Sequence, residues 1–98
     1  MLNVSKLLKV LGDENRLKML TYLSQGELSV CEMMQKMNMS QPTVSHHLKI
    51  LKNLELIKSR KSGKWIYYRI DIEKARLFQE KLDELFDNLI GNSYCSKT

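Results

Sequence analysis

The stretch from Ser40 to Ile57 carries apolar and polar residues with the period of a half-buried helix. Val44, Leu48 and Leu51 recur at helical spacing and predict one buried stripe. Ser40 is a favourable N-cap residue, and Pro42 suits a first helical turn, where its missing N–H would lack a partner anyway. The opposite side carries hydrogen-bonding and cationic groups and no carboxylate: Gln41, Ser45, His46, Lys49, Lys52 and Asn53.

Three shorter helices are predicted before this one. An apolar cluster indicates a first amphipathic helix, which Gly12 and Asp13 interrupt: Leu7, Leu8, Val10 and Leu11. Asp13 is placed to cap a second helix that stops at Gly26, with an apolar side formed by Leu17, Leu20, Tyr22 and Leu23. A third helix is expected from about Ser29 to Met37, because Ser29 and Glu32 have the spacing of a reciprocal capping box.

The short turn at residues 38–40 joins the third and fourth predicted helices into a helix-turn-helix over about residues 29–54. After Leu56 the period changes to two, and strand-like runs flank Lys61-Ser62-Gly63, where Gly63 can take the positive φ of a tight turn. The sequence therefore predicts a basic two-stranded hairpin, or wing, over about residues 57–70.

A last helix is expected over about residues 72–90, with Gly91 placed to end it and a frayed tail beyond. Its apolar positions alternate spacings of three and four, as in a helix that packs along another long helix: Ala75, Phe78, Leu82, Leu85 and Leu89. One short domain has little surface left to cover this seam, so we expect a symmetric partner. The fold predicted for residues 1–98 is a single, mainly α-helical winged helix-turn-helix domain with a small β-hairpin and a long C-terminal dimerisation helix.

The charge distribution adds a function class to this fold. The formal net charge is +5, and residues 40–69 hold seven Lys or Arg against one acid, Glu55. Such concentration is typical of a nucleic-acid-binding face, although a solvated basic surface without a partner is the alternative. We expect phosphate contacts from Lys49, Arg60, Lys61 and Lys64, and contacts to base edges from Gln41, Thr43, Ser45 and His46.

Several function classes are disfavoured by what the sequence lacks. Cys31 and Cys95 form no CxxC pair and no cysteine-rich spacing, so a reducing cytoplasm is expected rather than a secreted disulfide framework. No apolar run reaches the length of a membrane span, and the first ten residues lack a signal-peptide layout. There is no recognisable nucleophile and base, phosphate-binding glycine loop or carboxylate pair, so we do not expect an enzyme.

The two histidines and the aromatic residues of the hairpin each allow two interpretations. His46 and His47 are adjacent and point about 100° apart on a helix, so they cannot chelate one ion side by side. His46 is expected to face outward, and His47 to be a hydrogen-bonded structural histidine near the buried stripe. Trp65 and its neighbouring tyrosines could stack on single-stranded bases, but sheet and core packing is the commoner role.

Three strings in order resemble the ArsR/SmtB family of bacterial and archaeal winged-helix repressors: LGDENRLKML, SQPTVSHHLKIL and RKSGKWIYYRI. The resemblance covers about residues 5–90. It implies a homodimer joined through the last helix and the first, where Leu7 and Leu11 lie. It also implies binding to an imperfect inverted repeat in an operator and release by an inducer. The family commonly has Gly where this chain has Glu55, so we expect the recognition helix to end differently here.

The resemblance does not extend to a complete sensing site. Arsenic sensors of the family often carry a C-V-C-D-L-C type string, and the matching string here, SVCEMM, keeps only Cys31. Trivalent arsenic in such a site takes three thiolates, and the last helix has no histidine for the family's other metal site. Cys31 is then either a small buried helix residue or one half of a two-thiol site. The other half would be Cys95 of the same or the partner chain, and the pair would bind a soft metal or metalloid or form a redox-sensitive disulfide.

The sequence as a whole favours a dimeric, sequence-specific transcriptional repressor released from its operator by a soft metal, a metalloid or a thiol oxidant. Two alternatives remain at this point. One is a constitutive DNA-binding regulator without an inducer, in which both cysteines are incidental. The other is a winged-helix protein-interaction module, which the basic segment disfavours because an interaction helix more often presents exposed apolar anchors.

Overall fold

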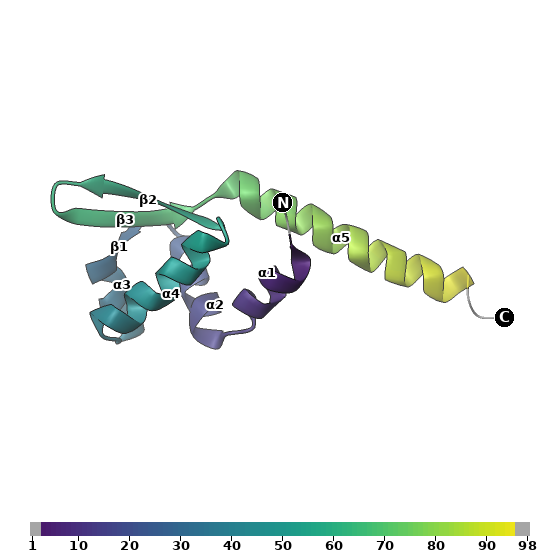
Figure 1. The fold of residues 1–98 in the computed structure, drawn as a ribbon, viewed down its shortest axis with the longest axis horizontal. Coiled ribbons are helices and arrows are strands. Elements are labelled where there is room, and N and C mark those ends of the chain that lie inside the picture. Colours follow the sequence, from purple (N-terminus) through teal and green to yellow (C-terminus); the bar gives the residue numbers. More distant parts are fainter. Residues whose placement is uncertain (1–2, 96–98) are drawn as a thin grey trace.

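A computed structural model describes the backbone of residues 3–95 and the side chains of residues 3–91. The chain forms a winged helix-turn-helix whose elements follow in the order α1 Val4–Leu11, α2 Glu14–Leu23, β1 Leu28–Ser29, α3 Val30–Met37, α4 Gln41–Asn53, β2 Ile57–Ser62, β3 Trp65–Ile70 and α5 Ile72–Cys95. Helices α2 to α4 lie on one side of the sheet and α1 lies between α2 and α5, while α5 leaves this body along the long axis of the molecule (Figure 1). The molecule measures 62 × 24 × 22 Å. The predicted fold class is confirmed.

One hydrophobic core joins the helical body to the sheet and to the start of α5. Its most deeply buried side chains come from five elements: Leu7, Met19, Met33, Val44, Leu48, Leu51 and Ile57. The predicted stripe of Val44, Leu48 and Leu51 is therefore confirmed, with exposed fractions of 0%, 1% and 0%. Phe78 adds the first part of α5 to the same core.

The apolar side predicted for α2 is partly wrong. Leu17 is 47% exposed, whereas Met19, which the prediction left out, is fully buried. Leu20, Tyr22 and Leu23 of the predicted side do pack on the core, and on the same inward side the Nε of Arg16 donates to the backbone oxygen of Val10 at 2.7 Å. Residues 19 and 23 follow Arg16 by about one and two turns and share that side. The helix also ends at Leu23, before Gly26.

The capping box of α3 is present as predicted. Ser29 Oγ accepts from the Glu32 backbone N–H at 3.1 Å, and the Glu32 carboxylate accepts from the Ser29 N–H at 2.9 Å. At its other end α3 is closed by Asn38 in the left-handed conformation, with φ 54°. Asparagine tolerates this conformation better than most residues, so the turn into α4 can be short.

The predicted two-stranded wing is confirmed as the antiparallel pair β2 and β3, but the sheet has a third strand that the prediction lacks, in the order β1-β3-β2. The missed strand, β1, has only two residues, too few to show a period of two in the sequence. The turn also lies later than predicted: Ser62 pairs with Trp65, which leaves Gly63 and Lys64 as a two-residue loop. Gly63 has φ 61°, the positive value that the first position of a type II′ turn requires.

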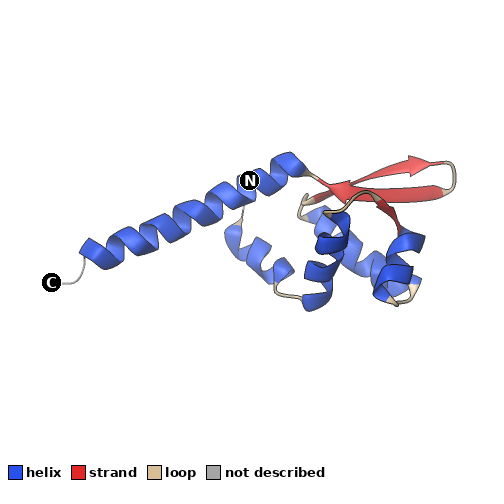
Figure 2. Cartoon of the chain, turned by 180° about the vertical axis from the view of Figure 1, so that it is seen from behind, coloured by secondary structure: helices blue, strands red, loops and turns tan. Residues whose placement is uncertain are grey.

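Helix α5 runs through Gly91 to Cys95, so the predicted end of the helix at residue 90 is wrong, while residues 96–98 of the predicted frayed tail lie outside the described residues. A glycine inside a helix costs about 1 kcal/mol relative to alanine, which a long helix tolerates. Figure 2, seen from behind, shows the distal half of α5 well away from the helical body. None of the helices in the described part of the chain has the length and apolarity that crossing a membrane requires.

Candidate nucleic-acid interface

Helix α4 has one buried and one exposed side, as the sequence predicts. The buried side holds Val44, His47, Leu48 and Leu51. The residues predicted to contact DNA are exposed, except the half-buried Ser45: Gln41, Thr43, His46 and Lys49. Ser40 occupies the N-cap position, but its hydroxyl lies 3.0 Å from the Thr43 hydroxyl and makes no hydrogen bond to the helix backbone. The first N–H groups of α4 thus have no side-chain cap, and an anion at this end would be favoured by the helix dipole.

A polar link fixes α4 against α2. His47 is 8% exposed, and its Nδ1 lies 3.3 Å from Nη1 of Arg16. A guanidinium group can donate hydrogen bonds but cannot accept them. The imidazole is therefore the acceptor in this contact, which requires neutral His47 with no proton on Nδ1. Burial lowers the pKa of His47, and the Arg16 cation lowers it further, while Asp13 opposes the shift. The prediction that His47 is a structural histidine and His46 an outward one is confirmed by their burial.

Asp13 organises the same corner from the N-cap of α2. Its Oδ1 accepts from the backbone N–H groups of Asn15 at 2.8 Å and Arg16 at 3.1 Å, which confirms the predicted cap. These backbone hydrogen bonds, the one from Arg16 above all, lower the pKa of the Asp13 carboxyl. The carboxylate thus caps α2 and lies 3.8 Å from the Arg16 cation.

The end of α4 is a left-handed cap despite the absence of glycine, so the expected different helix end is wrong. Glu55 has φ 66°. Its N–H donates to the Lys52 carbonyl at 2.8 Å, and the Leu56 N–H donates to the Leu51 carbonyl at 3.2 Å. These two bonds form the Schellman motif that glycine usually permits. Leu56 is buried, so core packing holds the strained residue in place.

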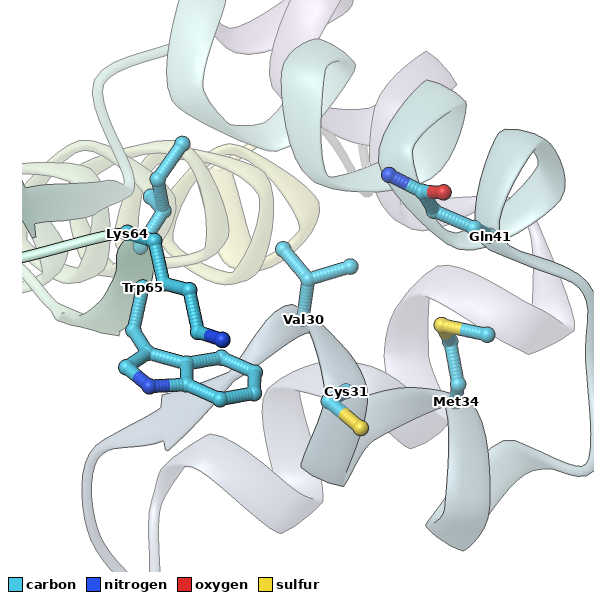
Figure 3. A pocket seen from close by; sticks show the side chains of 7 residues that line it. Val30, Cys31, Met34, Gln41, Lys64 and Trp65 are labelled. Atoms are coloured by element: carbon cyan, nitrogen blue, oxygen red, sulfur yellow. The ribbon is translucent and has the colours of Figure 1, made fainter.

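The wing tip and the start of α4 border one hollow of about 330 Å³. Figure 3 shows side chains from three elements around it: Val30, Cys31 and Met34 from α3, Gln41 from α4, and Lys64 and Trp65 from the wing. The Lys64 ammonium lies 5.4 Å from the centre of the Trp65 ring. The structure thus brings a predicted base-contacting residue, Gln41, near a predicted phosphate-contacting residue, Lys64.

Arg60 is placed differently from the lysines of the wing. Its guanidinium forms a bidentate pair with Glu27, through Nε to Oε2 at 2.9 Å and Nη2 to Oε1 at 2.7 Å. The hydrogen bond from Arg60 lowers the pKa of the Glu27 carboxyl, and the same bond raises the pKa of Arg60. Sequence reasoning missed Glu27 altogether, because the partners are 33 positions apart and no local spacing connects them.

Cys31 is exposed, so the interpretation of this residue as a buried helix position is wrong. Its thiol lies at the surface beside the hollow, with Met34 from the next turn (Figure 3). The side chain of Cys95 lies outside the described residues. Position 95 ends α5, far along the long axis from α3 in both overall views, so the same chain does not bring the two cysteines together. The described part of the chain holds no group of three or more His, Cys, Asp or Glu side chains fit for a metal ion.

The predicted dimerisation residues divide into two sets. One set packs on the protomer's own core: Leu7, Leu11, Ala75, Phe78 and Leu82. The other set lies on the distal half of α5, where Leu85 is 39% and Leu89 is 52% exposed, beside Phe86 and Ile90, each 57% exposed. Between α1 and α5 runs an apolar hollow of about 330 Å³, with Leu7, Phe78 and Phe86 among its lining residues.

Comparison with known proteins places these features in a family. Residues 13–59 match the profile described as "Bacterial regulatory protein, arsR family". The chain is 43% identical over 81 residues to a cadmium resistance transcriptional regulatory protein CadC homolog of Staphylococcus aureus, covering 82% of this chain and 67% of that protein. It is 41% identical to the arsenical resistance operon repressor of Staphylococcus xylosus, covering 82% of this chain and 77% of the repressor.

Solved structures agree with the sequence comparison. The homodimeric winged helix-turn-helix DNA-binding domain of a possible ArsR-family transcriptional regulator from Mycobacterium bovis superposes with a TM-score of 0.70 at 34% identity, covering 87% of this chain and 78% of that domain. An ArsR-like transcriptional regulator from Rhodococcus superposes with a TM-score of 0.84 at 22% identity, covering 96% of this chain and 89% of the other, and so supports the fold.

Proposed function

The chain belongs to the arsR family of bacterial regulatory proteins, and from this premise we propose that it is a dimeric, sequence-specific DNA-binding repressor acting on an inverted-repeat operator. The observation that carries the proposal is the exposed, carboxylate-free side of α4, which begins beside the basic wing at the hollow shared by Gln41 and Lys64. A helix of this kind fits the major groove while the wing reaches the flanking backbone. Such a protein works on the chromosome in the cytoplasm, and we propose no enzymatic role for it.

The exposed residues of α4 and the wing divide by chemistry into two roles. Polar side chains in the first turns of α4 are assigned to base edges: Gln41, Thr43, Ser45 and His46. The flexible cations beside them are assigned to phosphates: Lys49 on the outward face of α4, and Lys61 and Lys64 at the wing tip. Together they give each protomer one half-site, and a two-fold dimer then requires two half-sites in inverted orientation.

The assignment to base edges is tested by the ratio of specific to random DNA binding. The probes are a duplex covering the promoter of the chain's own gene and a random duplex of equal length. Gln41→Ala and Ser45→Ala should weaken promoter binding and leave random binding nearly unchanged, each losing about 1–3 kcal/mol of discrimination if the contact is bidentate. Gln35→Ala, on the exposed side of α3, is the matched control and should change neither. Equal losses on both duplexes would refute the assignment.

We further propose that the inducing signal is a soft metal, a metalloid or a thiol oxidant acting at Cys31. Three observations support this: the thiol is exposed, it borders the hollow that holds Gln41, and relatives are named for cadmium and arsenical resistance. One thiolate holds a soft ion weakly, so a second ligand is required. Because α5 carries residue 95 away from α3, that ligand would be Cys95 of the partner subunit.

Release from DNA tests the sensing role. Arsenite, Cu(I) and peroxide are each added to the protein bound to the promoter duplex. Cys31→Ser and Cys95→Ser should each abolish release by the active compound while leaving affinity in the reduced, metal-free state unchanged. If the double variant responds like the wild type, or if the wild type responds to none of the three, the chain is a regulator whose signal does not act on its thiols.

A further inference from the structure

An ion pair crosses the sheet from the segment before β1 to the outer strand of the wing. Glu27 immediately precedes β1, Arg60 lies on β2, and the order β1-β3-β2 puts the central strand between them. Tyr67 of that strand pairs with Ser29 on one side and with Arg60 on the other. The Arg60 guanidinium lies 4.7 Å from the centre of the Tyr67 ring. The pair therefore spans the full width of the sheet at the level of Tyr67.

The geometry of this pair restricts the orientation of β2. Two parallel N–H···O bonds fix the plane of the guanidinium, and the aromatic ring beneath it removes a further degree of freedom. On the other side, β1 continues directly into α3 through the capping box of Ser29. The ion pair thus connects the outer strand of the wing to the helix-turn-helix, whereas the tip of the hairpin, residues 60–66, is exposed along its whole length.

We propose that Glu27 and Arg60 are positioning residues for DNA binding, which hold the wing so that Lys61 and Lys64 lie beside the first turn of α4. The inference rests on the proposed function. It gives Arg60 a role different from the phosphate contact that its charge predicts, because Glu27 neutralises the guanidinium and occupies two of its donors. It also gives a role to an acid that lies next to a cationic surface and would otherwise oppose DNA binding.

Neutralising Glu27 separates positioning from net charge, because the two effects have opposite signs. On charge alone, Glu27→Gln removes a carboxylate near the interface and should strengthen DNA binding. If the pair positions the wing, the variant should instead bind the promoter duplex about threefold to tenfold more weakly. The slope of log affinity against log salt should flatten by about 1 for each lysine that no longer reaches a phosphate. Glu55→Gln is the matched control, because it removes the same charge from a carboxylate that pairs with Lys74 on α5 and not with the wing. This variant should bind the promoter duplex no more weakly than the wild type does.

Trp65 gives a direct readout of the wing, since it is the protein's one tryptophan and follows the turn at the wing tip. In the absence of DNA, Glu27→Gln and Arg60→Lys should lower its steady-state fluorescence anisotropy, while the melting temperature changes little because exposed ion pairs add little stability. Arg60→Lys retains the cation but cannot form the two-pronged contact. The charge-reversed pair, Glu27→Arg with Arg60→Glu, should restore both the anisotropy and promoter affinity.

The outcomes distinguish this inference from the proposed function. Tighter promoter binding by Glu27→Gln with a steeper salt slope would mean that the released Arg60 reaches phosphate, and the positioning role would be wrong. Unchanged anisotropy in Glu27→Gln and Arg60→Lys would also overturn it. If the wild type itself binds promoter and random duplexes equally, the proposed function fails first, and a lowered anisotropy in the variants would show only that the pair holds the wing.

Discussion

Glu55 adopts, at the end of the recognition helix, a backbone conformation that glycine takes without steric cost. Its φ of 66° places Cβ against the following carbonyl. Its carboxylate is 70% exposed and, within the described part of the chain, pairs with Lys74 alone, at 3.6 Å. We expect Glu55→Gly to raise the free energy of unfolding by about 0.5–1 kcal/mol, after allowing for the greater unfolded-state entropy of glycine. Urea denaturation measures this. Glu55→Ala keeps the strain and removes the ion pair, so its free energy of unfolding should be no higher than that of the wild type. If Glu55→Gly is no more stable than Glu55→Ala, the backbone at this position is not strained.

His47 couples the packing of the recognition helix to pH. Burial lowers the pKa of His47 in the folded protein. When the pH falls below the ordinary histidine pKa of about 6.5, the unfolded chain therefore binds a proton at His47 more readily than the folded chain does. Stability should therefore fall as the pH drops below about 6.5, and be unaffected by this group above it. His47→Gln should lose this part of the pH dependence, measured as urea midpoints at pH 7.5 and 5.5. His46→Gln is the control and should keep most of the wild-type difference, because burial, the main cause of the lowered pKa of His47, is unchanged in it. Equal differences in both variants would exclude His47 as the source.

At the residue scale, what could be predicted depends on sequence distance. The capping box of Ser29 and Glu32 and the buried stripe of α4 follow from spacings of three and four, so they are visible in the sequence. The contacts of Arg16 with His47 and of Arg60 with Glu27 join residues 31 and 33 positions apart, and only the folded chain brings them together. The burial of Met19 in place of Leu17 on α2 also depends on which neighbours the folded chain brings to that helix.

At the scale of elements, we propose that the distal part of α5 forms the dimer interface, while the part nearest the core packs on its own protomer. Leu82 is half-buried there, so Leu82→Glu would damage the fold as well as an interface. Leu85 is 39% exposed in the protomer, so Leu85→Glu should leave a folded monomer and remove the dimer, since a carboxylate in an apolar interface costs several kcal/mol. Analytical ultracentrifugation at micromolar concentration provides the measurement. Glu80→Gln, off the seam, should remain dimeric, and a dimeric Leu85→Glu would exclude the distal seam.

The first and last residues of a helix or strand can be predicted where a nearby side chain determines them, and they are missed where a distant contact does. Asp13 and Ser29 start helices through their own side chains, and both starts are predicted correctly. Gly91 lowers helix propensity but leaves the backbone hydrogen bonds intact, so α5 passes through it. Strand β1 forms by pairing with β3, about 40 positions away in the sequence. Two residues are too few for a local pattern that would predict this pairing.

At the scale of the whole molecule, the excess positive charge lies on α4 and the wing, so DNA affinity should depend steeply on salt. Lys64→Ala should flatten the slope of log affinity against log salt by about 1 for each protomer that makes the contact. Lys18→Ala, on the exposed side of α2, removes the same charge away from this surface and should leave the slope nearly unchanged. An unaltered slope in Lys64→Ala would take the wing tip out of the interface.

The exposed apolar side chains on distal α5 also affect how repression depends on the concentration of the protein. If Leu85, Phe86 and Ile90 are covered only when two protomers meet, the DNA-binding unit forms by second-order mass action. Below the dimer dissociation constant, operator occupancy then rises with the square of the protomer concentration. Doubling the amount of protein would quadruple the concentration of competent dimer, so a cell could set a sharp threshold for repression through expression level alone, before any inducer is present.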